Sequence, residues 1–254
     1  MYCTEKLFHT TSDLYRDHSF PCCGTHASES IFDICVAIDC TGSMGSYFPE
    51  VKKTVRAIVE KYNATEASTR FSIIGYTDHG SSASYPDHRP IGVYPPSKDL
   101  ESSSIEGVFS FIDNLSAGGG GDAPEAMIDA LDETTKLIWR DGNKIVYVVA
   151  DCGAHGKDLT PSADSYPEGC PCKLNWRSVL ENMKSKNIGL RFAKVANHVE
   201  TTISAFKTVY TGIEVMDLSA APHEQLSVFM VSDISSTIDT GLELSEVPTS
   251  MSLI

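Results

Sequence analysis

The sequence predicts an α/β fold: a doubly wound, mostly parallel sheet with helices on both faces. Two observations support this prediction. Strand-like and helix-like patterns alternate from Ile31 almost to the end of the chain, and this alternation is typical of parallel strands joined by helical crossovers. Residues 144–150 are apolar nearly throughout, as expected of a central strand that helices cover on both faces.

The expected strands are short apolar or β-branched runs bounded by turn residues, at residues 31–38, 71–76, 91–94, 144–150, 190–195 and 213–216. The expected helices are segments in which apolar residues recur at helical spacing, at residues 48–62, 103–114, 127–138, 176–183, 199–210 and 226–238. Prolines flank residues 91–94 and indicate an edge strand, because proline cannot donate to an inner ladder.

The chain divides into three expected segments. Residues 1–30 show no clean periodicity and are expected to form an N-terminal arm, residues 31–240 one folded domain, and residues 241–254 a C-terminal tail. A chain of 254 residues is long enough for one sizeable core. Within the domain, residues 151–174 are rich in Pro, Gly and Ser and predict a long loop.

Composition narrows the class of partner. Acidic residues outnumber basic residues 34 to 20, and the formal net charge is -14. Nucleic acids and anionic membrane surfaces attract clusters of lysine and arginine, so neither is expected as a partner. No apolar run approaches the length needed to span a membrane, and residues 1–6 lack the pattern of a signal peptide.

The cysteines predict a reducing compartment. Of the eight cysteines, Cys35, Cys40 and Cys152 lie in or beside expected buried strands and loops, where reduced thiols behave as small hydrophobes. We therefore expect a cytoplasmic protein without structural disulfides.

The most informative segment follows the first expected strand. Asp39, Thr41 and Ser43 stand at alternate positions on a short loop that leads into a helical pattern. Hydroxyl and carboxylate oxygens suit Mg²⁺, Ca²⁺ or Mn²⁺ and suit zinc poorly. Capping of the following helix is the alternative explanation, but one cap needs only one such residue.

Two further loops with oxygen ligands are expected at the same edge of the sheet. One contains Asp122 and Glu125 and opens a helix, and the other begins at Asp151, directly after the central strand. Ligands of doubly wound sheets bind at the carboxyl ends of the strands, near the point where the strand order reverses. Three such loops at these positions predict a metal site.

Over roughly residues 30 to 240, the chain resembles a von Willebrand factor type A domain, and its Asp-x-Thr-Gly-Ser loop resembles that family's metal-ion-dependent adhesion site. The resemblance is closest to an intracellular branch found in some alpha-kinases and in standalone microbial and protist proteins. The shared segments are Gly75-Tyr76-x-Asp78-His79, Gly119-Gly120-Gly121-Asp122-x-Pro124-Glu125, Trp139-Arg140, Ala150-Asp151 with His155-Gly156, and Pro167-x-Gly169-Cys170-Pro171.

The resemblance implies a set of metal ligands. In the family the loop hydroxyls bind the cation directly, which gives this role to Thr41 and Ser43. The loop aspartate binds directly or through water, which corresponds to Asp39. The aspartate after the central strand usually acts through water, which corresponds to Asp151.

The second loop departs from the common pattern. Many family members supply a threonine there, whereas this chain has glycines followed by Asp122 and Glu125. That variant resembles the integrin beta-type domain, whose matching glutamate reaches the metal. Glu125 is therefore the expected ligand, with Asp122 as the second candidate. The alternative is a capping box, in which Asp122 and Glu125 satisfy the backbone of the following helix.

The resemblance also implies a function. A Mg²⁺ or Mn²⁺ ion held largely by neutral hydroxyls would keep a position open for an Asp or Glu carboxylate of a protein partner. Two alternatives are a metal-dependent hydrolase that uses His155 beside Asp151, and a metal-independent scaffold. An enzyme is not expected, because no general base or set of oxyanion donors is identifiable from the sequence.

A zinc site is a further candidate, formed by Cys152, His155, Cys170 and Cys172 around the long loop. Free thiols in an irregular loop are the alternative, because the spacing of Cys170 and Cys172 is tight for a structural zinc site.

Overall fold

The computed structural model describes residues 31–63, 68–80 and 91–219, together with positions 232 and 236. The expected N-terminal arm and C-terminal tail lie outside the described residues, as does nearly all of the helix expected at 226–238. In the described part of the chain, no helix combines the length and apolar character needed to cross a membrane.

The six-stranded sheet confirms the predicted α/β class. Its order is β3-β2-β1-β4-β5-β6, and only β3 runs antiparallel to its neighbour. β3 is also the edge strand that its flanking prolines predict. The strands are β1 (Ile31–Asp39), β2 (Ser68–Tyr76), β3 (Ile91–Tyr94), β4 (Asn143–Cys152), β5 (Ile188–His198) and β6 (Glu214–Asp217).

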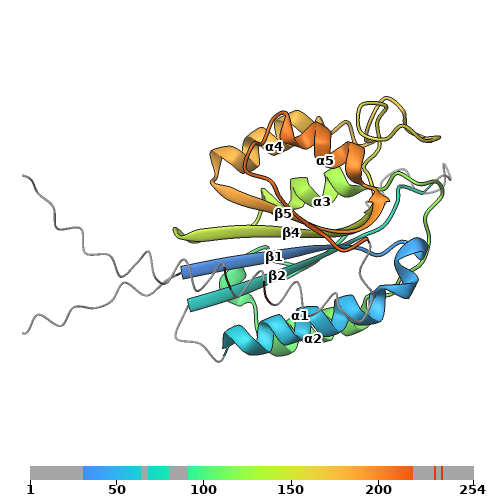
Figure 1. The fold of residues 1–254 in the computed structure, drawn as a ribbon. Helices are drawn as coiled ribbons and strands as arrows, with labels where there is room; N and C mark the ends of the chain where they lie inside the picture. The colour runs from blue at the N-terminus through green and yellow to red at the C-terminus, as the bar shows by residue number, and fades with distance from the viewer. Residues whose placement is uncertain (1–30, 64–67, 81–90, 220–231, 233–235, 237–254) are drawn as a thin grey trace, which may run out of the picture.

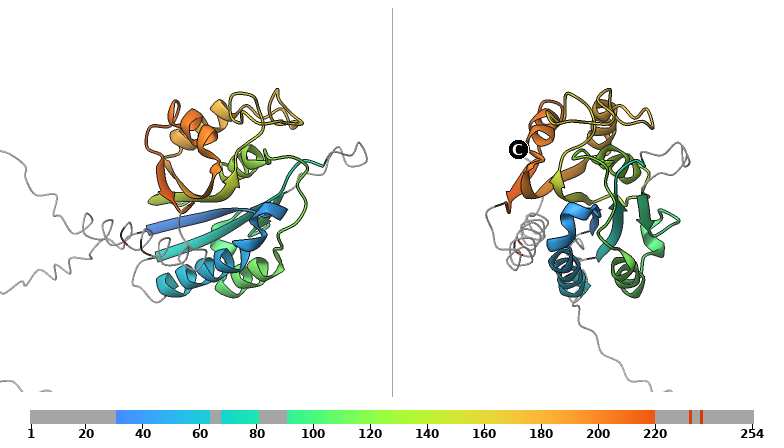
Figure 2. Two further views of the ribbon diagram at one scale, coloured as in Figure 1. Left: turned by 45° about the vertical axis from the view of Figure 1, so that its right-hand side comes forward. Right: turned by 90° about the vertical axis from the view of Figure 1, so that its right-hand side faces the viewer.

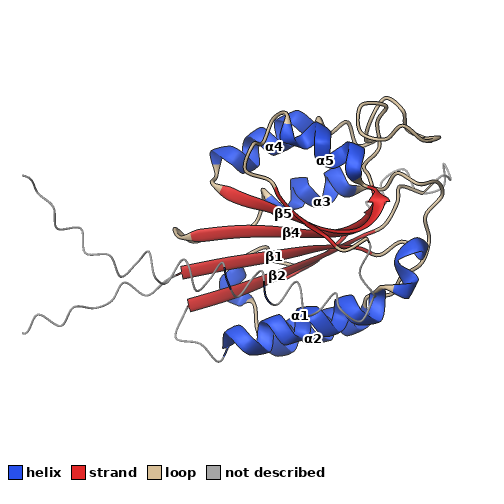
Figure 3. Ribbon diagram, in the orientation of Figure 1, coloured by secondary structure: helices blue, strands red, loops and turns tan. Residues whose placement is uncertain are grey.

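Helices cover both faces of the sheet (Figures 1 and 2). One face carries α1 (Phe48–Asn63) and α2 (Ile105–Asn114). The other carries α3 (Met127–Thr134), α4 (Trp176–Ser185) and α5 (Glu200–Lys207). Figure 3 shows the same three-layer arrangement by element type, with the loops gathered at the end of the sheet toward which the arrowhead of β5 points.

β1 explains why the sheet needs both layers. Ile34, Val36 and Ile38 pack in the core beneath α1 and α2, whereas Cys35 and Ala37 pack in the core beneath α3, α4 and α5. Successive side chains of a strand point to opposite faces, so an apolar run with no polar alternation has to be buried on both.

The helix expected at 127–138 ends four residues early, at Thr134. Beyond it, the backbone N–H of Ile138 donates to the carbonyl of Lys98 at 2.9 Å, and Ile138 forms an isolated bridge with Asp99. Leu137 is nevertheless buried. Helical spacing therefore predicted the burial of Leu137 correctly, while tertiary pairing of the backbone ended the helix.

A buried ion network lies near the amino end of β1. Asp33 accepts hydrogen bonds from Nη2 of Arg70 and Nη2 of Arg140, each at 2.7 Å, and from the backbone N–H of Arg140 at 2.8 Å. Burial alone would raise the pKa of Asp33, but the hydrogen bonds from Arg70 and Arg140 outweigh it and hold that pKa below its usual value.

This network predicts a large effect of one substitution on stability. Arg140→Met leaves the buried Asp33 carboxylate with one arginine instead of two, and we expect a loss of about 3–5 kcal/mol in the free energy of unfolding. Urea titration followed by circular dichroism measures the change.

Lys157→Met is the matched control, because Lys157 pairs with Glu168 on the surface at 3.2 Å and both side chains are largely exposed. It should cost less than about 1 kcal/mol. Equal losses in the two variants would contradict a structural role for the Asp33 network.

Candidate metal centre

Three predicted site residues meet at the carboxyl edge of the sheet. Asp39 is the last residue of β1, and Asp151 is the penultimate residue of the adjacent strand β4. Glu125 precedes α3, and its backbone N–H donates to the carbonyl of Gly153 at 2.9 Å, directly beyond β4. β1 and β4 flank the point where the strand order reverses, so the site lies where the topology predicts it.

The first loop positions its oxygens through local hydrogen bonds. Oδ1 of Asp39 accepts from the backbone N–H of Thr41 at 2.9 Å and from its hydroxyl at 2.7 Å. The hydroxyl oxygens of Thr41 and Ser43 are 3.1 Å apart. Adjacent ligands of an octahedral Mg²⁺ ion lie about 3.0 Å apart, so this hydroxyl pair fits one edge of that geometry.

Helix capping does not explain these residues. The short 3₁₀ helix η1 (Gly42–Ser46) has Thr41 as its N-cap, and no side chain caps it. The N-cap of α3 is Ala126, again without a side-chain cap. The capping-box alternative for Asp122 and Glu125 is therefore wrong.

The three carboxylates each bury an oxygen that has no hydrogen-bond partner. These atoms are Oδ2 of Asp39, Oε2 of Glu125 and Oδ1 of Asp151. Buried polar atoms are almost always paired, because desolvation without a partner is costly. Three such oxygens at one edge of a sheet are a donor set that suits a hard divalent cation.

Electrostatics at this edge favour a positive charge. Burial raises the pKa of Asp39 to about 7, and the neighbouring Asp151 adds to the effect. Burial also raises the pKa of Glu125 to about 10, with further contributions from Asp39 and Asp78. Carboxylates that crowd together without water disfavour their charged forms, and a bound cation reverses that preference.

The glycine run brings its backbone against the first loop. The N–H of Gly42 donates to the carbonyl of Gly119 at 3.1 Å, and the N–H of Gly118 donates to the carbonyl of Cys40 at 2.9 Å. Gly120 has a φ of +94°, which side-chain-bearing residues rarely adopt. The glycine run, Gly118 to Gly121, therefore allows its backbone to approach the first loop closely.

A pocket of about 750 Å³ opens over these loops. Its described lining includes four predicted ligands, Thr41, Ser43, Glu125 and Asp151, and also His198, which sequence reasoning missed. Asp122 lines the pocket as well, but one of its carboxylate oxygens accepts a hydrogen bond from the backbone of Ser165. Oδ1 of Asp122 and Oε2 of Glu125 are both buried without a hydrogen-bond partner. Glu125 is the better-placed ligand because it is buried beside Asp39 and Asp151, whereas Asp122 is half-buried and tied to Ser165.

His155 is not placed as a general base for this pocket. It is buried, is not among the lining residues, and has its ring nitrogens 2.7 Å from Asp78 and 2.8 Å from Asp164. Burial alone would lower the pKa of His155, but hydrogen bonds to Asp78 and Asp164 outweigh it and raise that pKa. The three ligand atoms of Asp78, Asp122 and His155 lie within 4.8 Å of one another, and the histidine is already engaged on both sides.

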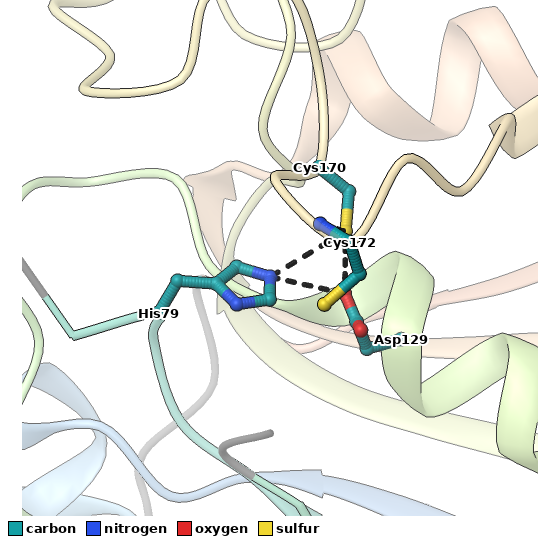
Figure 4. Close-up of side chains that lie close together, drawn as sticks. All are labelled: His79, Asp129, Cys170 and Cys172. Atoms are coloured by element: carbon teal, nitrogen blue, oxygen red, sulfur yellow. Dashed lines mark hydrogen bonds and ion pairs between the residues drawn. The ribbon is translucent and has the colours of Figure 1, made fainter. Parts of the chain in front are cut away.

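The structure does not bring the four residues of the candidate zinc set together. Cys170 and Cys172 group with His79 and Asp129 instead of Cys152 and His155 (Figure 4). Asp129 lies on the buried side of α3, and a carboxylate among apolar helix positions was the signal that could have identified it.

Comparison with known proteins agrees with the fold described above. A family model of the von Willebrand factor type A domain matches residues 33–240. The chain is 29% identical over 172 residues to the alpha-protein kinase vwkA of Dictyostelium discoideum, and 25% identical over 197 residues to the ariadne-like RING finger protein R811 of Acanthamoeba polyphaga mimivirus. These alignments cover 66% and 72% of this chain but only 26% and 18% of those proteins.

Among solved structures, the pilus adhesin SpaC from Lactobacillus rhamnosus GG in its open conformation superposes with a TM-score of 0.57 at 11% identity. The superposition covers 83% of this chain and 30% of the adhesin chain, and it shows a shared fold.

Gly153, whose carbonyl accepts the hydrogen bond from the N–H of Glu125, has little space for a side chain. A Cβ atom added at Gly153 would stand 2.4 Å from the hydroxyl of Thr202 and 2.8 Å from that of Thr160. Both hydroxyls are buried and hydrogen-bonded, so they cannot move aside freely. Gly153→Ala should lower the free energy of unfolding by about 1–3 kcal/mol, measured by urea titration.

Gly118→Ala is the control in the same group of loops, since an added Cβ there meets no atom within 4 Å. Its effect should stay within about 0.5 kcal/mol of the wild type. A Gly153→Ala protein as stable as Gly118→Ala would show that the loop after β4 is not held as described.

Proposed function

This chain belongs to the von Willebrand factor type A family, and from that premise we propose that it is a divalent-cation-dependent module for binding proteins. Domains of this family are generally interaction modules and not enzymes, and the matches in a Dictyostelium kinase and a mimivirus protein are consistent with its intracellular and protist branch. The observation that carries the proposal is that Asp39, Glu125 and Asp151, at one edge of the sheet, each bury a partnerless carboxylate oxygen, and that a pair of hydroxyls lies on the first loop.

We assign the cation to five residues. Thr41 and Ser43 offer neutral hydroxyls, and Asp39 holds the Thr41 hydroxyl in place while offering its second oxygen. Glu125 and Asp151 supply the remaining negative charge from the other two loops. The hydroxyl spacing fits Mg²⁺, and Mn²⁺ accepts the same oxygen ligands.

The partner we propose is a protein that presents an exposed Asp or Glu. The cation would supply the Lewis acidity, and the pocket over the loops is large enough to admit a side chain. The partner's carboxylate would complete the coordination by taking the place of water. Binding would then require both the ion and the acidic residue.

The setting we propose is the cytoplasm. Among the described residues, the buried Cys35, Cys40, Cys152 and Cys170 and the exposed Cys172 form no disulfide. Such thiols persist in reducing compartments. The position of His155 gives no support to the hydrolase alternative, and the partnerless carboxylates argue against a metal-independent scaffold.

Calorimetric titration tests the metal site. Mg²⁺ and Mn²⁺ should bind the wild type, and Asp39→Ala/Ser43→Ala should bind at least about tenfold more weakly, equivalent to about 1.4 kcal/mol or more. The protein is first freed of adventitious zinc. Circular dichroism confirms that the variant is folded.

Ser46→Ala is the matched control, because Ser46 lines the same pocket but is outside the proposed ligand set. It should bind both ions like the wild type. Identical isotherms for the wild type and the double variant would overturn the proposed site.

Peptide selection tests the partner. A displayed library of random peptides is selected for binding to the wild type in the presence of Mg²⁺. The selected peptides should share an essential Asp or Glu, and a metal chelator should release them from the protein. Replacing that residue by Asn or Gln should abolish binding, because a neutral amide is a poor ligand for a hard cation. Binders that resist chelator, or that tolerate the amide, would contradict carboxylate capture.

A further inference from the structure

A second cluster of metal-binding side chains lies away from the pocket. Its members are His79, Asp129, Cys170 and Cys172, and their ligand atoms all lie within 4.8 Å of one another. None of the four lines the pocket over the first site. Figure 4 shows the four side chains pointing toward a common centre.

The distances within the cluster are those of atoms that can share one ion. Sγ of Cys170 is 3.5 Å from Nε2 of His79 and 2.8 Å from Oδ2 of Asp129. Nε2 of His79 is 3.0 Å from the same Asp129 oxygen. Ligands of a tetrahedral zinc ion lie about 3.3–3.8 Å apart, so the histidine–cysteine distance already fits and the aspartate needs only a small shift.

The chemistry of the four ligands selects the ion. One imidazole nitrogen, one carboxylate oxygen and two thiol sulfurs are the ligand types of tetrahedral Zn²⁺. Mg²⁺ and Ca²⁺ prefer oxygen ligands only. His79, Asp129 and Cys170 are also buried, and Cys172 is the one exposed member of the cluster.

The backbone conformation around Cys170 and Cys172 suits the binding of one ion by both sulfurs. The N–H of Cys172 donates to Sγ of Cys170 at 3.3 Å and would support a thiolate on a bound ion. Burial and the neighbouring Asp129 otherwise raise the pKa of the Cys170 thiol, and a bound cation would reverse that preference. Lys173, the residue after Cys172, takes a left-handed φ of 61°, and its N–H donates to the carbonyl of Cys170 at 2.9 Å. This turn overcomes the tight sequence spacing and lets both sulfurs face the same centre.

The four ligands come from three separate parts of the chain. His79 follows β2, Asp129 lies in α3, and both cysteines lie in the segment 153–175 between β4 and α4. That segment contains no helix or strand, and loops of its length need specific support or a function. An ion at the cluster would join the loop to α3 and to the end of β2.

We propose that these four residues form a structural zinc site that anchors the 153–175 loop to the fold. The ion binds Nε2 of His79, a carboxylate oxygen of Asp129 and the two cysteine sulfurs, and each thiol releases its proton to solvent. With four protein ligands the site is closed and has no role in catalysis. It is independent of the Mg²⁺ site in composition and in position.

Asp78 connects the zinc site to the first metal site through two hydrogen bonds. Oδ1 of Asp78 accepts from the N–H of His79 at 2.6 Å, and Oδ2 accepts from the N–H of Gly121 at 3.2 Å. Gly121 belongs to the glycine run beside the first metal loop. Fixing His79 therefore also fixes the loop that presents Glu125.

Metal analysis of the full chain, purified with reductant and without chelator, tests the proposal. The wild type should contain about one zinc per chain. After exchange with Co²⁺ it should show thiolate-to-cobalt charge transfer and the intense visible bands of tetrahedral cobalt. Cys170→Ser/Cys172→Ser should lose the zinc and both spectral features, whereas Cys152→Ser should keep them.

Two further variants separate the possible outcomes. His79→Cys preserves a ligand and should keep one zinc while raising the thiolate charge-transfer intensity by about half, from two sulfurs to three. Asp39→Ala/Ser43→Ala should keep its zinc, which separates this site from the first. A wild type that binds neither zinc nor cobalt, a cobalt form without thiolate bands, or a folded cysteine double variant with full zinc would each overturn the proposal.

Discussion

The site depends on how the charges of two buried aspartates on β1 are balanced. Asp33, near the amino end of β1, is surrounded by Arg70 and Arg140, and its pKa lies below the usual value. Asp39, at the carboxyl end, has no arginine, keeps one oxygen without a partner, and has a pKa raised to about 7 by burial and by Asp151. The same strand thus carries one carboxylate, Asp33, whose charge is balanced by arginines, and one carboxylate, Asp39, whose charge a bound cation would balance.

The topology places the remaining ligands beside Asp39. β4 is the parallel neighbour of β1 and carries Asp151 as its penultimate residue at the same edge. The hydrogen bond between the backbone groups of Glu125 and Gly153 brings the start of α3 against the loop after β4. The glycine run then closes on the first loop through backbone hydrogen bonds. Every contributor reaches the site through regular sheet geometry or a main-chain contact, which makes the constellation a property of the fold.

Local patterns predicted what depends on local structure. The alternating strand and helix signals predicted the sheet, and the spacing of Asp39, Thr41 and Ser43 predicted one loop in which their oxygens converge, as found. The choice between metal ligand and capping box for Glu125 could not be made from spacing, because both need a carboxylate at the start of a helix. The structure decides against the cap, since Ala126 occupies that position.

Long-range contacts account for what the sequence did not predict. Cys152 and His155 stand close to Cys170 in sequence, yet the loop directs His155 to Asp78 and Asp164. His79 and Asp129 lie far along the chain from both cysteines, and only the packed fold brings them together. The early end of α3 has the same origin, a backbone contact between Ile138 and Lys98.

The most direct test of the central claim is an anomalous-scattering map from a crystal of the chain soaked in Mn²⁺. The account predicts one manganese peak at bonding distance, about 2.2 Å, from the hydroxyl oxygens of Thr41 and Ser43, with Glu125 turned toward it. A crystal that binds manganese elsewhere, or not at all while Asp39 and Glu125 keep their present positions, would contradict it.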